Sequence, residues 1–369
     1  MIKATILLCG PPLSALGGGP THMRNLMASA LSERYRIVHF ETGSRGTESP
    51  ARDEGVLAKA LRFVTSPVAL ALSIARFRPA VVHLNSAVDQ KAFWRDLVYL
   101  AISKLFGRRV VFQLHGGSLT ALCRARAMRR VARAAYSIPD ALVLLAESEK
   151  REFGQLGVSG RLSIIPNGVN VEQFSGPEDR MHSGRIRRLA FMGRLIRPKG
   201  MFEAMEAIRI LRADESFRDV ELWIAGSGPA KDEIASWSRA HGMDGCIKLV
   251  GSVYGRDKVE FFRGADVFVF PTYHLEGLPY AILESLAAGT PVIASRVAGI
   301  PDVVGDRIHG RLIDAKDPRQ IVDAVHELSR SEADLQAMSR RCSSWARQQL
   351  GLERLASQFE GLYEDMRAR

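Results

Sequence analysis

Short apolar runs alternate with longer segments of helical pattern along most of the chain. The runs are typical of buried strands, and the segments between them carry good helix formers or apolar positions at helical spacing. Strands that alternate with helices in this way predict an α/β protein with doubly wound parallel sheets. The expected strands cover residues 2–9, 36–40, 80–85, 110–114, 140–145, 188–192, 220–225, 247–250, 265–270 and 291–295.

Breaks in the pattern predict how the chain divides. Residues 170–187 are polar, contain proline and glycine and show no periodicity, as a linker would. We therefore expect an N-terminal domain over 1–172, a linker over 173–187, a second domain over 188–344 and a C-terminal helix over 345–369 that packs on the first domain. Two more expectations are a helix over 55–77 interrupted near Pro67, and helices alone between residue 295 and about Arg340.

Composition limits the classes of protein to consider. The chain has 369 residues, 46% hydrophobic and 25% charged, as in a soluble globular protein of about two domains. No apolar run reaches the roughly 18–20 residues that span a bilayer, and the start of the chain is too short and too soon broken for a signal peptide. The four cysteines are scattered without metal-ligand spacing, so we expect a reduced, cytoplasmic setting and no metal site.

The net charge of +11 is unevenly distributed. Residues 1–170 hold 23 Lys and Arg against 11 Asp and Glu, whereas residues 171–369 hold 28 against 29. The first half therefore carries all of the positive excess. Such asymmetry indicates an anionic partner for that half, with nucleic acid, an anionic membrane and a phosphorylated substrate as candidates.

A cluster of arginines between residues 122 and 135 sharpens that choice. Arg126, Arg129, Arg130 and Arg133 share one helix face. The face could simply be solvated, or it could contact anionic lipid headgroups. Nucleic acid is disfavoured, because the chain shows no recognised nucleic-acid-binding module and few aromatic residues among these arginines.

Residues 274–295 hold a pattern that suggests chemistry. Glu276, Gly277 and Leu278 read as a loop, Pro279 suits a first helical position, and a helix follows that contains Glu284. The free N–H groups of a helix N-terminus favour an anion. Two carboxylates beside an anion site make sense if the anion also carries hydroxyl groups, as a sugar nucleotide does. The alternative is a pair of solvated glutamates.

Two cations lie at another expected strand-to-helix turn. Arg194 follows a strand and Gly193, and Lys199 precedes the next helix. Fixed cations beside a helix N-terminus form a good diphosphate site, although both could be bare surface residues. The Gly226-Ser227-Gly228 turn lacks the third glycine of a dinucleotide fingerprint.

The first half offers its own candidates at strand ends. Gly18 and Gly19 lie in a glycine loop between a strand and a helix expected from Thr21, an arrangement that can bind phosphate or can be only a tight turn. Asn85 and His115 end two further strands, where ligands of doubly wound sheets bind.

Taken in order, these motifs resemble the retaining nucleotide-sugar glycosyltransferases of the GT-B fold, in particular the bacterial family-four group. The resemblance covers nearly the whole chain. It rests on the glycine loop, the histidine at a first-domain strand end, Pro166-Asn167-Gly168, the Arg194 and Lys199 turn, the Gly226–Gly228 turn and the two glutamates. It implies two Rossmann-like domains that face each other across a cleft.

The resemblance also implies roles. Glu276, Arg194, Lys199 and His115 would be catalytic: the two cations stabilise the departing diphosphate, Glu276 contacts the transferred sugar and His115 lies near it. Glu284 would bind the ribose, and the loop that contains Val253 would face the base. The remaining donor contacts would come from Gly18, Gly19, Gly193, Gly277, Leu278 and Pro279.

The partners follow from the resemblance and the charge. The donor would be a UDP- or GDP-sugar, with no metal or other cofactor, and the sugar would be transferred with retention. A basic first domain suits a lipid-linked or oligosaccharide acceptor in polysaccharide biosynthesis, at the inner face of the cell membrane. Two alternatives stay open: a GT-B epimerase that releases the nucleotide without transfer, and a catalytically silent sugar-nucleotide-binding subunit.

Overall fold

The chain folds into two units of similar architecture in a computed structural model that describes residues 3–42, 56–175 and 185–368, without the side chains of 56–62. Unit 1 comprises Met1–Gly168, Glu276–Leu278 and Leu352–Arg369, and unit 2 comprises Val169–Leu275 and Pro279–Gly351. The predicted linker, 173–187, falls mostly outside the described residues.

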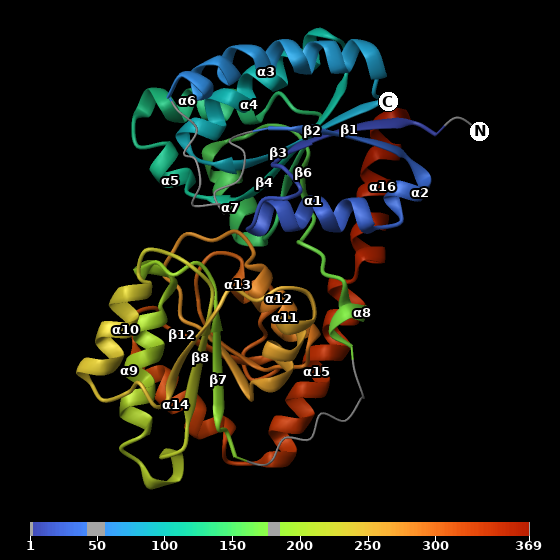
Figure 1. The fold of residues 1–369 in the computed structure, drawn as a ribbon. Coiled ribbons are helices and arrows are strands. Elements are labelled where there is room, and N and C mark those ends of the chain that lie inside the picture. Colours follow the sequence, from blue (N-terminus) through green and yellow to red (C-terminus); the bar gives the residue numbers. More distant parts are fainter. Residues whose placement is uncertain (1–2, 43–55, 176–184, 369) are drawn as a thin grey trace. The chain divides into compact units, whose positions relative to one another are not determined.

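Unit 1 is built on a six-stranded sheet in the order β2-β1-β3-β4-β5-β6 (Figure 1). Every neighbouring pair is parallel. Its central strands are almost fully buried, because helices cover both faces. The strands are β1 (Thr5–Gly10), β2 (Arg36–Glu41), β3 (Val81–Val88), β4 (Arg109–Gly117), β5 (Ala141–Leu144) and β6 (Leu162–Ile164).

Two apolar cores lie on the two faces of this sheet. One core packs the sheet against α3, α4, α5, α6 and α7. The other packs it against α1, α2 and the C-terminal helix α16, whose Phe359 is fully buried. The helices are α1 (Gly18–Ala28), α2 (Leu31–Arg34), α3 (Val56–Phe77), α4 (Gln90–Leu105), α5 (Leu119–Leu122), α6 (Arg126–Tyr136), α7 (Glu147–Leu156) and α16 (Leu352–Ala368).

Unit 2 repeats the plan with a parallel sheet in the order β12-β11-β10-β7-β8-β9. Helices α9 and α14 pack together, as do α12 and α15. The strands are β7 (Arg188–Met192), β8 (Glu221–Ala225), β9 (Ile247–Gly251), β10 (Val267–Phe270), β11 (Val292–Ser295) and β12 (Gly310–Ile313). The helices are α8 (Val171–Phe174), α9 (Met201–Leu211), α10 (Lys231–Ala240), α11 (Gly255–Gly264), α12 (Tyr280–Ala287), α13 (Ile300–Val303), α14 (Pro318–Leu328) and α15 (Glu332–Leu350), with 3₁₀ turns η1 (Arg197–Lys199) and η2 (Glu215–Phe217).

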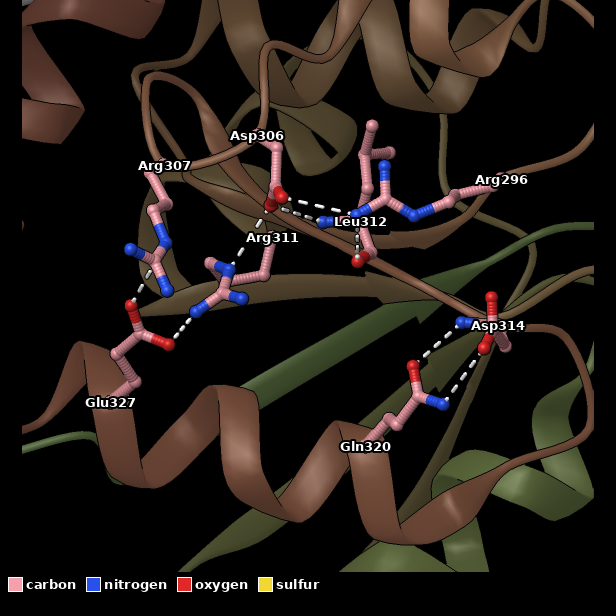
Figure 2. Close-up of polar contacts among 8 residues, drawn as sticks. All are labelled: Arg296, Asp306, Arg307, Arg311, Leu312, Asp314, Gln320 and Glu327. Carbon is pink, nitrogen blue, oxygen red and sulfur yellow. Dashed lines mark hydrogen bonds and ion pairs between the residues drawn. The ribbon is translucent and has the colours of Figure 1, made fainter.

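A charged network secures the edge strand of unit 2 (Figure 2). Asp306 accepts hydrogen bonds from the backbone N–H of Leu312 at 2.9 Å and from Arg311 at 3.1 Å, and it pairs with Arg296 at 3.1 Å. Arg311 also pairs with Glu327 on α14. The network thus ties β12 to the loop before it and to the helix after it.

Each sheet has one point where the strand order reverses, and this point locates the expected ligand edge. In unit 1 it lies between β1 and β3, because β2 is on one side of β1 and the later strands are on the other. In unit 2 it lies between β7 and β10. The predicted fold class, doubly wound parallel α/β with two Rossmann-like sheets, is confirmed.

The structure corrects several expected elements. Strand β12 lies between residues 295 and 340, where only helices were expected, and β6 was not predicted. Helix α3 runs through Pro67 without a break, because its buried residues Leu70 and Ile74 continue to pack on the sheet beyond the proline. The expected C-terminal helix is divided at Gly351 into α15 and α16.

Candidate functional site

The cation-bearing turn of unit 2 lies at the carboxyl end of β7, at the point where the strand order reverses. Backbone hydrogen bonds hold it to the turn after β8: Gly193 N–H donates to the Ala225 carbonyl at 3.1 Å, and Leu195 N–H to that of Ser227 at 2.8 Å. Between these two anchors the Arg194 side chain is exposed. The backbone that carries Arg194 is therefore held in place while its guanidinium faces outward.

The glycines of the Gly226–Gly228 turn make room for this loop. Gly226 has φ +133°, and a Cβ on it would lie 1.9 Å from the Gly193 carbonyl oxygen. A Cβ on Gly228, at φ +156°, would lie 2.4 Å from the carbonyl oxygen of Leu195. The turn therefore serves close backbone packing.

Lys199 is positioned from the other side, by the loop after β10. The Pro198 carbonyl accepts hydrogen bonds from the N–H groups of Tyr273 and His274, both at 2.9 Å, and from the Thr272 hydroxyl at 3.2 Å. Gly200 has φ +86° and passes close to the Pro271 carbonyl. These bonds join the loops after β7 and β10, so Lys199 lies directly before the N-terminus of α9 at the ligand edge of the sheet.

Two neighbours of these cations were not expected from sequence. Arg197 pairs with Glu233 on α10, and its guanidinium lies 4.6 Å from the centre of the Phe202 ring. The Lys199 ammonium lies 5.5 Å from the centre of the Phe270 ring at the end of β10. The turn thus carries a third cation, Arg197, whose charge is neutralised by Glu233.

Glu284 is buried in the middle of α12 and forms an ion pair with Lys258 of α11. The Lys258 ammonium also lies 5.9 Å from the centre of the Phe174 ring. A carboxylate can accept about four hydrogen bonds, so this pairing orients Glu284 and still allows it to accept bonds from a ligand. Sequence reasoning missed Lys258, because it lies 26 residues earlier on a different helix and shares no motif with Glu284.

The start of α12 differs by one residue from the expectation. Pro279 is the N-cap and the helix begins at Tyr280. Gly289 ends the segment with φ +71°, as expected for a glycine after a helix. By contacts, Glu276, Gly277 and Leu278 group with unit 1, whereas Pro279 and Glu284 belong to unit 2. Val253 lies in the loop between β9 and α11.

In unit 1 the glycine loop is already part of a helix. Helix α1 begins at Gly18, three residues before the expected start, with Gly17 at φ +114° as N-cap. Glycine and proline are tolerated there because first-turn N–H groups have no intrahelical partner. Gly18 and Gly19 therefore belong to a helix N-terminus and not to a loop.

His115 lies near the end of β4, and its bonding fixes which nitrogen carries the proton. Its Nε2 lies 2.9 Å from Oδ1 of Asn85, whose Nδ2 donates to the Cys9 carbonyl at 3.2 Å. Because Oδ1 can only accept, His115 donates from Nε2 and its Nδ1 carries a lone pair. Burial lowers the pKa of His115 to about 4, so the ring is neutral at physiological pH.

Two more histidines extend a buried polar layer beneath this edge. The His22 ring lies 4.5 Å from that of His115, centre to centre. His83 lies 2.7 Å from the Tyr363 hydroxyl through Nδ1 and 3.1 Å from Oε1 of Gln113 through Nε2. Burial, and then the neighbouring His115, lower the pKa of His83 to about 3 and that of His22 well below its ordinary value. We call His22, His83 and His115 the histidine layer.

The four arginines expected to share a face do so on α6. All four are exposed on this helix, which buries Ala132, Ala135 and Tyr136 on its other side. Within residues 3–42, 56–175 and 185–368, no carboxylate pairs with any of them. In the same part of the chain, no three His, Cys, Asp or Glu side chains gather as metal ligands would. The absence of a metal from the reaction stays a prediction.

Comparison with solved structures gives the class of fold. Sucrose-phosphate synthase from Thermosynechococcus elongatus aligns over 99% of this chain and all of its own, with a TM-score of 0.82 at 18% identity. HepE from Anabaena, solved in complex with UDP, aligns over 98% of this chain and all of its own, with a TM-score of 0.76 at 16% identity. These neighbours and the two doubly wound sheets define the GT-B fold.

The family follows from the sequence. A Glycosyltransferase Family 4 model matches residues 16–173 and a Glycosyl transferases group 1 model matches residues 182–349, so the chain belongs to these glycosyltransferases. It is 33% identical over 199 residues to a putative teichuronic acid biosynthesis glycosyltransferase of Bacillus subtilis, covering 51% of this chain and 47% of the relative. It is 35% identical over 170 residues to phosphatidyl-myo-inositol mannosyltransferase of Mycobacterium leprae, covering 46% and 44%. The chain spans about half the length of the curated relatives it matches.

Proposed function

We propose that the chain transfers a hexose from a UDP- or GDP-sugar to an acceptor, with retention at the anomeric carbon. The observation that carries this proposal is the turn of Arg194 and Lys199, which backbone hydrogen bonds anchor on both sides at the ligand edge of unit 2. Departure of a nucleoside diphosphate develops negative charge, and cations already in place stabilise it. The structural neighbour HepE was solved with UDP and with UDP-glucose, which agrees with such a donor.

Each part of the donor is assigned to predicted residues whose chemistry suits it. Arg194, Lys199 and the backbone at Gly193 bind the diphosphate, and the buried Glu284, oriented by Lys258, accepts bonds from the ribose. The loop with Val253 meets the base. Glu276 and the backbone of Gly277, Leu278 and Pro279 contact the sugar as positioning groups and not as a covalent nucleophile, because retention by attack on the vacated face needs none.

Unit 1 contributes the N-terminus of helix α1 and a neutral histidine that accepts a hydrogen bond. The first-turn N–H groups of Gly18 and Gly19 meet the diphosphate. His115, neutral and with its proton on Nε2, accepts a hydrogen bond from a sugar hydroxyl through Nδ1. A neutral ring suits a sugar hydroxyl, because it leaves the diphosphate as the only charged part of the ligand that needs cations.

The acceptor is a lipid-linked saccharide, used in polysaccharide assembly at the inner face of the cell membrane. The excess of positive charge in the first half supports this. An isoprenoid or phospholipid acceptor contains phosphate and lies in a negatively charged membrane surface, which attracts basic residues. Two relatives have names that mention biosynthesis of teichuronic acid and of amylovoran, and a third is a phosphatidyl-myo-inositol mannosyltransferase.

A screen of donors tests the proposal. Thermal unfolding is followed with UDP, GDP, ADP and their glucose and mannose conjugates, because a ligand of the folded state raises its stability. A shift with UDP- or GDP-sugars but not with free sugars supports a nucleotide-sugar donor, and no shift with any nucleotide contradicts it. The bound donor is then incubated with the chain alone and with lipid extract: free epimerised sugar indicates the epimerase, sugar on lipid indicates transfer, and unchanged donor indicates the silent subunit.

A further inference from the structure

Helix α3 is apolar on two sides. Its inner side packs Leu70 and Ile74, both fully buried, on the sheet of unit 1. Its outer side carries Val64, Val68 and Leu72, one turn apart, with 68%, 59% and 65% of their surfaces exposed. Exposed Phe63 adjoins this row, and the 22-residue helix contains no acidic residue. A helix with an apolar outer row needs a partner for it.

The neighbouring helices extend this surface. Because β3, β4 and β5 follow one another across the sheet, α3, α4 and α6 lie in that order over the same face (Figure 1). Helix α3 packs on α4, and Phe93 of α4 contacts the Tyr136 ring of α6. We call their exposed outer residues the apolar–arginine face: Phe63, Val64, Val68, Leu72, Trp94, Val98, Arg126, Arg129, Arg130, Val131 and Arg133.

The charge of this face is uncompensated. The carboxylate of Asp96 on α4 is buried and bound by Arg95 at 2.6 Å. Asp140 after α6 is bound by Lys104 and Arg109. Among the described residues, the arginines of α6 have no such partner. The face therefore combines an apolar row with several free positive charges, which is the composition of a helix surface that lies at a membrane interface.

The arginines also argue against a second copy of the chain as the occupant. A symmetric dimer buries the same patch from both copies. It would therefore bring the arginines of α6 towards those of the partner, and like charges across an interface are unfavourable. An anionic bilayer instead offers phosphates to the arginines and acyl chains to the valines and leucine.

We propose that the apolar–arginine face docks on an anionic lipid bilayer, with the outer row of α3 entering the boundary between headgroups and acyl chains and the arginines of α6 binding headgroup phosphates. This extends the proposed function, because it adds the surface that holds the protein beside a lipid-borne acceptor. No helix among the described residues has the length and hydropathy to cross a bilayer.

Cosedimentation of the full chain with vesicles tests the docking. The chain is expected to bind phosphatidylcholine vesicles that contain about a third phosphatidylglycerol, and part of this binding should persist at 0.5 M salt, because apolar insertion is not screened. The double variant Val68→Gln, Leu72→Gln should lose the salt-resistant part and bind at least about tenfold more weakly. The variant Arg129→Gln, Arg130→Gln should weaken low-salt binding by about fivefold per arginine.

A matched control and three contrary outcomes complete the design. Ile308→Gln changes a half-exposed apolar residue of unit 2 and should leave vesicle binding unchanged. Wild-type binding that ignores lipid charge, or α3 variants that bind as wild type does, would overturn the docking. So would a dimer in light scattering that Leu72→Gln dissociates. The nucleotide-sugar thermal shift is measured on the same samples: if it persists while vesicle binding is absent, the docking fails and the proposed donor chemistry stands.

Discussion

Both units are built on a six-stranded parallel sheet, but their strand orders differ, and so do the groups that each places near the carboxyl ends of its strands. Unit 2 has Arg194 and Lys199 there, on a turn held by backbone hydrogen bonds. Unit 1 has the histidine layer, which burial keeps neutral and of which His115 lies near the end of β4. The ends of the strands thus carry exposed positive charge in unit 2 and a neutral histidine in unit 1. The donor proposed above likewise has a charged part, the diphosphate, and an uncharged part, the sugar.

The units also keep their overall charge in different places. In unit 2 several cations are neutralised in ion pairs, such as those of Arg197 with Glu233 and Arg311 with Glu327. On the outer face of unit 1, α6 leaves its arginines without carboxylate partners among the described residues. The two units therefore differ in where positive charge is left without a carboxylate partner, and the following changes test each part of this contrast.

The largest effect is expected at the cations of unit 2. Lys199→Ala should lower transfer by roughly 100-fold or more, because in the proposed mechanism Lys199 stabilises the charge of the departing diphosphate. Cooperative unfolding should change little, since the Lys199 side chain is half-exposed. Lys231→Ala, an exposed lysine on α10, is the matched control and should keep wild-type turnover. Near-normal turnover in folded Lys199→Ala would remove Lys199 from the proposed mechanism.

Next comes the glycine turn that positions Arg194. Gly226→Ala should lower the free energy of unfolding by roughly 3 kcal/mol or more, because the new Cβ would meet the Gly193 carbonyl at a strained φ. Gly242→Ala has a positive φ of +64° but open space, so urea unfolding should show a loss of about 1 kcal/mol. Equal losses in the two variants would mean that close packing against Gly193 is unimportant.

The buried pair of Glu284 is expected to matter less. Lys258→Met should reduce the free energy of unfolding by about 2–3 kcal/mol, since it leaves a buried carboxylate without its cation. It should also weaken nucleotide binding. Lys248→Met breaks the more exposed pair with Glu221 and should change stability by less than about 1 kcal/mol. A Lys258→Met protein as stable as Lys248→Met would show that Glu284 does not depend on Lys258.

The smallest effect is expected for the pH dependence of stability that the histidine layer causes. The pKa values of His83 and His115 in the folded protein are about 3 and about 4, below the ordinary value near 6.5. Below pH 6.5 the unfolded chain therefore binds more protons than the folded protein. The contribution of the layer to the free energy of unfolding is fully present above that pH and falls as the pH drops towards 4.

Each histidine adds up to about 1.4 kcal/mol per pH unit to the slope of stability within that window. His83→Gln should flatten the slope measured by urea unfolding between pH 5 and 7.5, whereas the surface variant His241→Gln in unit 2 should not. An unchanged slope in His83→Gln would show that this histidine is not held neutral by the fold.

The alternation of strands and helices was enough to predict the fold class, because short apolar runs such as residues 267–270 between segments of helical pattern are typical of buried strands. Strand β12 was not predicted, because it has only four residues and begins with Gly310, whose φ is +151°. The continuity of α3 through Pro67 was not predicted for a different reason. Packing of Leu70 and Ile74 on the sheet outweighs the loss of one backbone donor, and local sequence does not record that packing.

The candidate residues on strand ends were predictable, because parallel sheets bring such ends to one edge. Their partners were not. Lys258 lies on a helix far along the chain from Glu284, and His22 meets His115 only through tertiary packing. The glycine turn at 226–228 shows the same limit: the sequence shows only that it lacks a dinucleotide fingerprint, whereas the structure gives its glycines a role in packing against Gly193 and Leu195.

The central claim is that the Arg194 and Lys199 turn binds the diphosphate of the donor. Calorimetric titration with UDP and UMP, or GDP and GMP if guanine is the preferred base, measures this directly. The account predicts that the wild-type chain binds the diphosphate much more tightly than the monophosphate, and that Lys199→Ala loses most of this preference while it still binds the monophosphate as wild type does. An equal preference in both proteins would contradict the claim.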